Sequence, residues 1–238
     1  MIDIHTHILP GLDDGSSSIE ESEKMLCMLS EQGVDTVVAT PHFYIDNTKV
    51  EDFLELRCTC AEKLIKAVDE ATRPQIVLGA EVQFFPEIYT MDNVEKLCIG
   101  GTKYMLVEMP FESWSGYTYK ALGKLYTARG IMPIIAHVER YLEFQEQSDT
   151  DVLRKLKDVN ALIQINSSFL TDRTTKRRAL KLVKKDLINF MGSDCHNMTT
   201  RMPIIEQGYR TIFKKLGEDG LAAFEYWEYK LKEKMIVF

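Results

Sequence analysis

The sequence predicts an α/β protein in which seven parallel strands close into a TIM-like (β/α)7 barrel. Short β-branched runs alternate with longer amphipathic stretches along the 238 residues, as in repeated strand–helix units. Two of these runs, residues 37–39 and 134–136, are continuously apolar, as parallel strands covered on both faces should be. A doubly wound open sheet gives the same alternation. The barrel is favoured because polar side chains gather at the strand ends, which share one mouth only in a barrel.

The first expected strand covers residues 1–4 and leads into His5 and His7. Side chains two residues apart in an extended strand project to the same side, so both imidazoles can reach one bound metal. Such a pair on a solvated face would usually have no function, so the rest of the chain decides what it means.

Capping signals mark the first helix. Ser17-x-x-Glu20 and Ser18-x-x-Glu21 are overlapping capping boxes, and Gly33 is a C-terminal stop, so this helix should run to about residue 32. Further strands are expected at 34–40, 75–80, 104–107, 132–136, 161–165 and 187–192, and further helices at about 50–71, 117–129, 149–159, 174–185, 203–215 and 220–234. No repeat or linker interrupts this order, so we expect a single catalytic domain over residues 1–238.

Composition excludes several classes of protein. The net charge is −7 and no block of Lys and Arg resembles a nucleic-acid footprint, so no nucleic-acid partner is expected. No run of 18 apolar residues is present, so no membrane insertion is expected. The five cysteines are irregularly spaced and argue against a disulfide framework, and the amino terminus lacks the pattern of a signal peptide. We therefore expect a cytoplasmic protein.

Histidines and carboxylates gather at the predicted strand ends. One histidine there would be an ordinary rim residue, but all five histidines of the sequence occupy such positions. The set is too large for one ion, which takes about three protein ligands beside an open position, and it suits two or three ions that share a carboxylate. Imidazole and carboxylate without thiolate favour Mn, Fe or Zn. The strand-end residues are His5, His7, His42, Glu81, Glu108, His137, Asp194 and His196.

A centre of this kind favours hydrolysis of a phosphate ester, because it binds an anion, makes hydroxide from water and stabilises the leaving oxygen. Arg140 follows His137 by three residues, and Arg201 follows His196 by five. Either arginine alone would suit a salt bridge at the rim. Together, beside a cluster that attracts anions, they indicate guanidinium groups that hold phosphate oxygens. Amide hydrolysis is the alternative chemistry for the same ligands.

Eight short motifs carry a family resemblance. They are Asp3-Ile4-His5-Thr6-His7, Leu12-Asp13-Asp14-Gly15, Thr40-Pro41-His42, Gly79-Ala80-Glu81, Val107-Glu108, Ala136-His137-Val138-Glu139-Arg140, Gln164-Ile165-Asn166 and Ser193-Asp194-Cys195-His196-Asn197. In this order, from Met1 to about Pro203, they resemble the polymerase-and-histidinol-phosphatase (PHP) superfamily. Within it they are most similar to the bacterial tyrosine-protein phosphatases encoded in capsule and exopolysaccharide loci.

The resemblance implies a distorted seven-stranded barrel of the PHP type with three divalent metal ions, manganese first and iron or zinc as alternatives. It implies one ion held by His5, His7, Glu81 and Asp194, a second by Glu81, Glu108 and His137, and a third by His42, His196 and an aspartate. Asp14, next to Gly15, is preferred as that aspartate, although spacing alone also allows Asp13.

The resemblance also implies a substrate and a mechanism. The substrate would be phosphotyrosine on a membrane-associated bacterial tyrosine kinase that controls capsule or exopolysaccharide synthesis. Arg140 and Arg201 would hold the phosphoryl group as the catalytic and substrate-binding arginines. A metal-bridging hydroxide would attack phosphorus in line, without a covalent enzyme intermediate.

Aromatic residues in the loops after the strands are candidates for the rim of the mouth. Aromatic walls suit the ring of phosphotyrosine, although half or more of these residues should be ordinary loop packing. They are Phe43, Tyr44, Phe84, Phe85, Phe111, Trp114, Tyr117 and Tyr141.

Other interpretations compete with this one. Cys195 and Arg201 have the Cys-x5-Arg spacing of thiol-based tyrosine phosphatases, but the residues between them lack the glycines that cradle phosphate. A PHP-type phosphatase of a small phosphomonoester such as histidinol phosphate is the closer alternative. An amidohydrolase would often carry a metal-bridging lysine at a strand end, and no strand end here has one. An inactive barrel kept as a binding module would have lost ligands, and none is missing.

Overall fold

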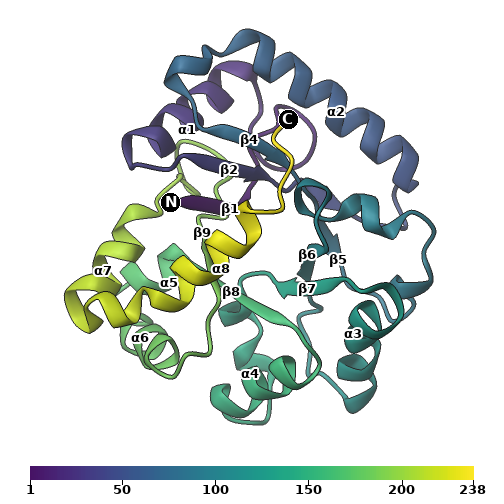
Figure 1. Ribbon diagram of the computed structural model, residues 1–238, viewed down its shortest axis with the longest axis vertical. Coiled ribbons are helices and arrows are strands. Elements are labelled where there is room, and N and C mark those ends of the chain that lie inside the picture. Colours follow the sequence, from purple (N-terminus) through teal and green to yellow (C-terminus); the bar gives the residue numbers. More distant parts are fainter.

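The strands form a curled, entirely parallel sheet at the centre of the molecule, with helices around it (Figure 1). The structure is a computed structural model that describes residues 1–238. The strands are β1 (Ile2–Thr6), β2 (Thr36–Ala39), β3 (His42–Phe43), β4 (Gln75–Leu78), β5 (Glu81–Gln83), β6 (Tyr104–Glu108), β7 (Met132–Ile135), β8 (Leu162–Asn166) and β9 (Phe190–Gly192). They pair in two groups, in the orders β1-β2-β4 and β3-β5-β6-β7-β8-β9.

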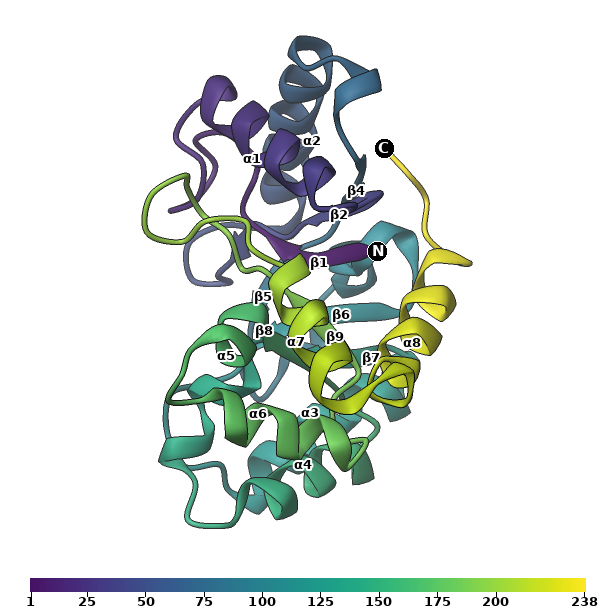
Figure 2. The same ribbon diagram turned by 90° about the vertical axis from the view of Figure 1, so that its left-hand side faces the viewer.

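Helices surround the strands on the outside. They are α1 (Ile19–Glu31), α2 (Val50–Ala67), α3 (Gly116–Arg129), α4 (Asp149–Asp158), α5 (Ser167–Thr171), α6 (Lys176–Lys184), α7 (Glu206–Leu216) and α8 (Ala222–Lys232). Figure 2 shows α1 and α2 on one side of the strands and α3, α4, α5 and α6 on the other, as in a ring of helices around a barrel. None of the helices combines the length and the hydrophobicity that a membrane crossing requires.

The second and third strands of the barrel are each broken in two. The predicted strand 34–40 corresponds to β2, and the predicted strand 75–80 corresponds to β4. β3 and β5 continue them beyond the predicted bounds, after breaks at 40–41 and 79–80. The first break contains Pro41, which has no N–H to donate, while its carbonyl accepts from the Glu81 N–H at 3.0 Å. At the second break, a side chain on Gly79 would lie about 3.2 Å from Val38. His42 and Glu81 therefore begin new strand segments, paired in register, rather than ending the old ones.

The barrel closes between its first and last strands. The His7 N–H donates to the Cys195 carbonyl at 2.9 Å, and the Asp194 N–H donates to the His5 carbonyl at 2.9 Å. Thr6 and Cys195 form a single parallel bridge at this seam. With the two broken strands counted once each, seven strand positions form the ring. The predicted seven-stranded barrel is confirmed, and the strand breaks are its distortion.

Several predicted elements differ in length or kind. The segment between β5 and β6 forms three short 3₁₀ turns instead of an α-helix, so not every strand is followed by a helix. The second helix ends at Ala67 rather than at about residue 71, because Val68 already has extended backbone. Strand β9 is half the predicted length, and α5 was not predicted, since five residues are too few for a periodic signal.

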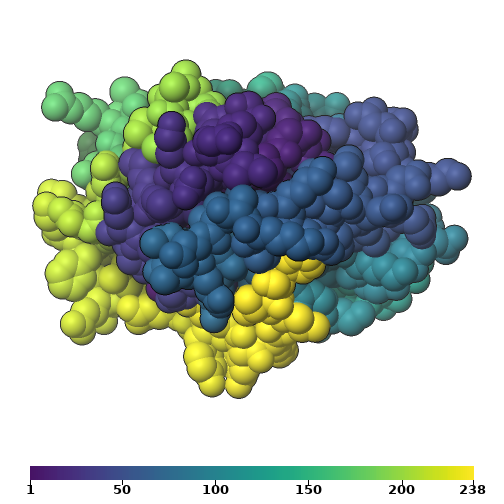
Figure 3. All heavy atoms as spheres, turned by 90° about the horizontal axis from the view of Figure 1, so that it is seen from above, coloured from purple at the N-terminus to yellow at the C-terminus, as the bar shows by residue number.

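Two apolar clusters hold the barrel together. The larger one lies between the strands and the surrounding helices, and Cys195 belongs to it. The smaller one fills the barrel interior with residues such as Ile4, Val38 and Leu106, and Leu231 of α8 packs into it. The chain end lies along the same end of the molecule, since the Phe238 N–H donates to the Ile76 carbonyl at 2.9 Å. Figure 3 shows this yellow C-terminal segment against the blue segment that contains β4.

Candidate metal centre

The strand-end histidines and carboxylates converge at one end of the barrel. His5 lies in β1, and His7 follows directly after it. His42 and Glu81 are the first residues of β3 and β5, just after the two strand breaks. The remaining members come from the end of β6 and from the loops after β7 and β9; they are Glu108, His137, Asp194 and His196. The structure therefore brings together all eight residues that the sequence placed at strand ends.

His5 and His7 lie two residues apart and project to the same side, and an irregularity in β1 lets that side face the cluster. The pairing of β1 with β2 shifts register between Asp3 and Thr6, so Ile4 can fill the barrel interior while the next side chain, His5, faces the cluster. Their Nε2 atoms lie 3.2 Å apart, and both imidazoles are buried. Gly192 of β9 permits this position, since a Cβ there would lie 2.7 Å from the Cβ of His5.

Glu81 is the central carboxylate of the cluster. One oxygen, Oε2, lies 3.1 Å from His5, 3.3 Å from His7 and 3.2 Å from His42, and the other, Oε1, lies 2.8 Å from His137. Burial alone would raise the pKa of Glu81, but His5 and the other histidines reverse this and hold the pKa well below its usual range. Glu81 is therefore ionised and can share its two oxygens between neighbouring cations.

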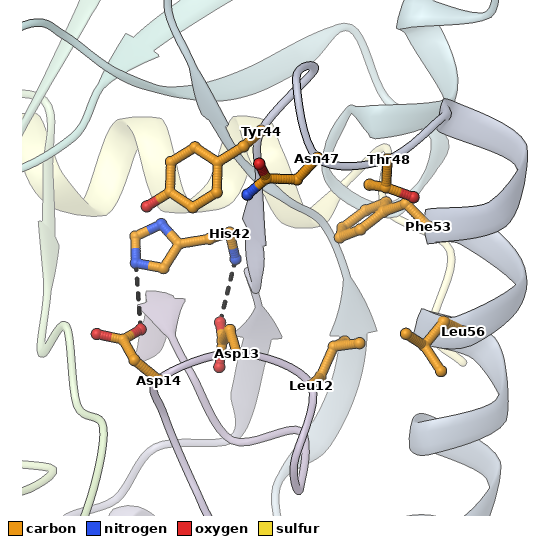
Figure 4. A pocket seen from close by; sticks show the side chains of 9 residues that line it. All are labelled: Leu12, Asp13, Asp14, His42, Tyr44, Asn47, Thr48, Phe53 and Leu56. Atoms are coloured by element: carbon orange, nitrogen blue, oxygen red, sulfur yellow. Dashed lines mark hydrogen bonds and ion pairs between the residues drawn. The ribbon is translucent and has the colours of Figure 1, made fainter.

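The neighbouring aspartates Asp13 and Asp14 have different environments. Asp13 Oδ2 lies 2.7 Å from His7 Nδ1 and accepts from the His42 N–H at 3.1 Å, while Oδ1 accepts from the Gly15 N–H. Asp14 is exposed, and its Oδ1 lies 3.4 Å from His42 Nε2, as Figure 4 shows, and 3.3 Å from His196 Nε2. The geometry therefore supports Asp14 as the residue that faces the cluster, with Asp13 behind His7.

Asp194 connects the cluster to both predicted arginines. Arg140 donates to its Oδ2 at 2.5 Å, and Arg201 donates to its Oδ1 at 2.6 Å. Asp194 has a φ of +54° and His137 a φ of +27°, values that non-glycine residues rarely adopt and that concentrate at functional sites. Both guanidinium groups are about one-third exposed, so they line the mouth and keep N–H groups free for a ligand.

Gln164 and Asn166 lie behind the cluster, and the motif that contains them did not reveal their role. The Gln164 side-chain oxygen accepts from the His137 N–H at 2.7 Å and lies 3.2 Å from His5 Nδ1. The Gln164 amide donates to Asn166, whose own amide donates to Asp194 at 2.9 Å. These hydrogen bonds orient His5, His137 and Asp194. The sequence did carry a signal for both residues. Gln164 and Asn166 lie two apart at the end of a predicted strand, so their side chains project to the same side, towards the cluster.

The ligand atoms fall into three overlapping groups. They are His5, His7 and Glu81; His7, Asp14, His42 and His196; and His42, Glu81 and Glu108. The first contains three of the four residues that the resemblance implies for one ion, and Asp194 Oδ1 lies 3.5 Å from His5. The second contains His42, His196 and Asp14, which the resemblance implies for another ion, together with His7. In the third, Glu108 is grouped with His42 rather than with His137. His42 Nδ1 and His196 Nε2 are buried and lie 3.2 and 3.3 Å from carboxylate oxygens, but neither forms a hydrogen bond, which is costly for an imidazole that binds nothing. The residues therefore fit bound metal ions.

The aromatic candidates separate into core and rim. Phe43, Phe84, Trp114 and Tyr141 are buried. Tyr44 is half-buried and stacks on His42, with ring centroids 5.2 Å apart and planes 20° apart. Phe85 is also half-buried, and Phe111 and Tyr117 are exposed. The expectation that half of this set is ordinary packing agrees with these positions.

A parallel barrel with five histidines and several carboxylates at its mouth is typical of metal-dependent hydrolases, and this protein has the fold and the site of that class. A family model described as "Capsular polysaccharide synthesis, CpsB/CapC" matches residues 1–226. The chain belongs to this CpsB/CapC family, which confirms the predicted resemblance.

Similar proteins share most of their length with this chain. It is 34% identical to tyrosine-protein phosphatase CpsB of Streptococcus pneumoniae, over 91% of each chain. It is 32% identical to tyrosine-protein phosphatase YwqE of Bacillus subtilis, over 92% of this chain and 86% of that protein. A crystal structure from the pair YwqE and CpsB, metal-dependent tyrosine phosphatases, superposes with a TM-score of 0.83 at 30% identity, covering 100% of this chain and 97% of that one.

The likeness to a small-molecule phosphatase is confined to the fold. Histidinol phosphate phosphatase from Lactococcus lactis superposes with a TM-score of 0.54 at 13% identity, over 92% of this chain and 93% of that one. This agrees with the predicted PHP-type barrel and carries no statement about substrate.

Proposed function

We propose that this protein, a metal-dependent tyrosine-protein phosphatase of the CpsB/YwqE type, removes phosphate from tyrosines of a bacterial kinase that regulates capsule or exopolysaccharide synthesis. The observation that carries the proposal is the buried histidine–carboxylate cluster with two partly exposed arginines beside it. The whole chain, residues 1–238, acts as one catalytic domain, in agreement with a family match over residues 1–226.

Three divalent ions would occupy the centre, manganese by preference and iron or zinc as alternatives. Glu81 is the shared ligand, because its two oxygens face different histidines. The ligands are His5, His7, Asp14, His42, Glu81, Glu108, His137, Asp194 and His196. When bound, such ions activate water as a nucleophile and stabilise negative charge on the phosphoryl and leaving oxygens.

Arg140 and Arg201 act as the substrate-binding and catalytic arginines. Asp194 accepts from one nitrogen of each, which holds both guanidinium groups beside the cluster, where they line a pocket with their other N–H groups available. Paired N–H groups match the spacing of phosphate oxygens and neutralise charge that grows in the transition state. Pre-orientation by a buried carboxylate reduces the conformational entropy lost when phosphate binds.

Thiol catalysis is disfavoured by the position of Cys195. Its side chain is fully buried in the apolar layer between strands and helices, on the opposite side of the strand from the cluster. Burial raises the pKa of the Cys195 thiol, so the nucleophilic thiolate is suppressed.

Hydrolysis of a phosphotyrosyl peptide by chelator-stripped protein, before and after adding Mn²⁺, tests the proposal. Each sample is also assayed after thiol alkylation, and with histidinol phosphate as a comparison substrate. We expect activity that disappears on stripping, returns with Mn²⁺, survives alkylation and favours the peptide. Activity that survives stripping and is lost on alkylation would instead indicate thiol catalysis by Cys195 with Arg201. A preference for histidinol phosphate would replace the protein substrate by a small phosphomonoester.

A further inference from the structure

A groove of about 440 Å³ opens directly beside the metal centre. It lies between the turn after β1 and the first turns of α2, as Figure 4 shows. His42 and Asp14 line its near end and also belong to the candidate metal centre. Asp13 also lines this near end, and farther out apolar side chains form the walls together with two polar side chains from the loop before α2. These lining residues are Leu12, Tyr44, Phe53 and Leu56, with Asn47 and Thr48.

The surroundings of the mouth are asymmetric. On the arginine side, a smaller pocket of about 190 Å³ is lined mostly by hydroxyl, amide and charged groups, including Ser167, Ser168 and Thr171. It offers little to an apolar side chain. On the α2 side, Leu56 is 52% exposed at the far end of the groove, while Phe53 forms a buried floor. A concave, partly apolar surface that continues from a polar site is the usual form of a ligand-binding groove.

We propose that the groove binds an apolar side chain next to the phosphotyrosine in the substrate protein. The inference rests on the proposed function, because the phosphate in the centre and the groove are then occupied by one continuous peptide. The phosphotyrosine ring takes the near end against Tyr44, which already stacks on His42. Leu12 and Leu56 contact the neighbouring apolar residue, and the exposed Asn47 amide hydrogen-bonds to the peptide main chain.

A peptide explains the groove better than a small phosphate ester does. A small ester would fill the space over the centre and leave the surface out to Leu56 uncovered. A peptide extends past its phosphorylated residue and buries that surface, which contributes to transition-state binding from a part of the substrate remote from the reaction. The groove therefore sets sequence preference around the tyrosine, while the centre and the arginines set the requirement for phosphate.

Leu56→Asp tests the groove, with Phe213→Asp as the matched control. Both parent side chains are 52% exposed, and Phe213 lies on α7, away from α2 (Figure 1). Hydrolysis of three substrates is compared in the presence of Mn²⁺. They are free phosphotyrosine, a peptide with leucine on both sides of the phosphotyrosine, and the same peptide with aspartate on both sides. Binding of peptides that carry a non-hydrolysable phosphonate at the tyrosine position is measured by fluorescence anisotropy as a second readout.

We expect kcat/KM of Leu56→Asp for the leucine-flanked peptide to fall about ten-fold, the scale set by lost contacts in an apolar pocket. Free phosphotyrosine should be hydrolysed as by the parent protein, and Phe213→Asp should match the parent throughout. An equal loss on all three substrates, or no loss on the leucine-flanked peptide, overturns the inference. If the parent protein hydrolyses histidinol phosphate and none of the three, the proposed function fails, and the inference fails with it.

Discussion

At the scale of single residues, the Asp13–Asp14 pair shows how neighbours acquire different roles. Asp13 is almost fully buried, and burial alone would raise its pKa, but the hydrogen bond from His7 and the charge of that histidine lower it to about 2. Because the Asp13 carboxylate accepts from His7 Nδ1, Nε2 is the ring nitrogen of His7 that faces Glu81 and the cluster. The sequence offered both aspartates to the cluster, because spacing cannot show which one a tight turn directs outward.

Asp13→Ala should therefore weaken metal binding although Asp13 does not face the cluster. Loss of a carboxylate that orients a metal-binding histidine typically costs about 10- to 100-fold in metal affinity or activity. Competition with a chelator, titrated against Mn²⁺, measures the affinity. Asp46→Ala, an exposed aspartate of the next loop, serves as the control. Unchanged affinity in Asp13→Ala would mean that Asp13 has no part in positioning His7.

At the scale of elements, strand existence was predictable and strand continuity was not. The seven strand positions followed from short apolar runs, but the breaks depend on contacts from elsewhere in the chain. Arg57 of α2 is buried and donates to the Gly79 carbonyl, a group freed where β4 stops. A buried guanidinium next to a backbone break leaves no periodic signal in the sequence. Pro41 was the one local sign, since proline interrupts a central strand.

The first helix offers a test of a predicted cap. Both capping boxes were possible, and the structure uses Ser18, whose hydroxyl accepts from the Glu21 N–H, while the Glu21 carboxylate accepts from the Ser17 N–H. We expect Ser18→Ala to lower the free energy of unfolding by about 1 kcal/mol. Ser17→Ala should stay within about 0.5 kcal/mol, as exposed substitutions usually do. Urea denaturation measures both, and equal losses would contradict the assignment of the cap.

At the scale of the whole molecule, the site and the barrel depend on each other. The strand-end residues were predictable as a set because a parallel barrel brings all its strand ends to one mouth. Their grouping was not, since the pairing of Glu108 with His42 depends on how far the broken strands are displaced. The seam between β1 and β9 contains a single bridge, and His5, His7, Asp194 and His196 all lie beside it. Ions held by these residues would join the two sides of the seam.

Metal binding should therefore stabilise the fold as well as enable activity. An ion that binds only the folded chain, at a concentration 100-fold above its Kd, adds about 2.7 kcal/mol to the free energy of unfolding. For a chain of this size, 1 kcal/mol corresponds to about 2–4 °C, so Mn²⁺ should raise Tm by roughly 5–10 °C over chelated protein. Calorimetry measures the shift, and hydrogen exchange should show slower exchange at the His7 and Asp194 amides, which form the seam.

The matched variant for this prediction is His7→Ala, which removes a ligand at the seam, compared with Asp46→Ala. The Mn²⁺-dependent rise in Tm should be smaller in His7→Ala and unchanged in Asp46→Ala. A general effect of divalent salt would raise Tm equally in both variants and leave exchange at the seam unaltered. If Mn²⁺ restores activity without changing Tm or exchange, the barrel is already closed without its ions. The metal centre would then contribute to chemistry alone, and the two sides of the seam would be held by backbone hydrogen bonds and packing.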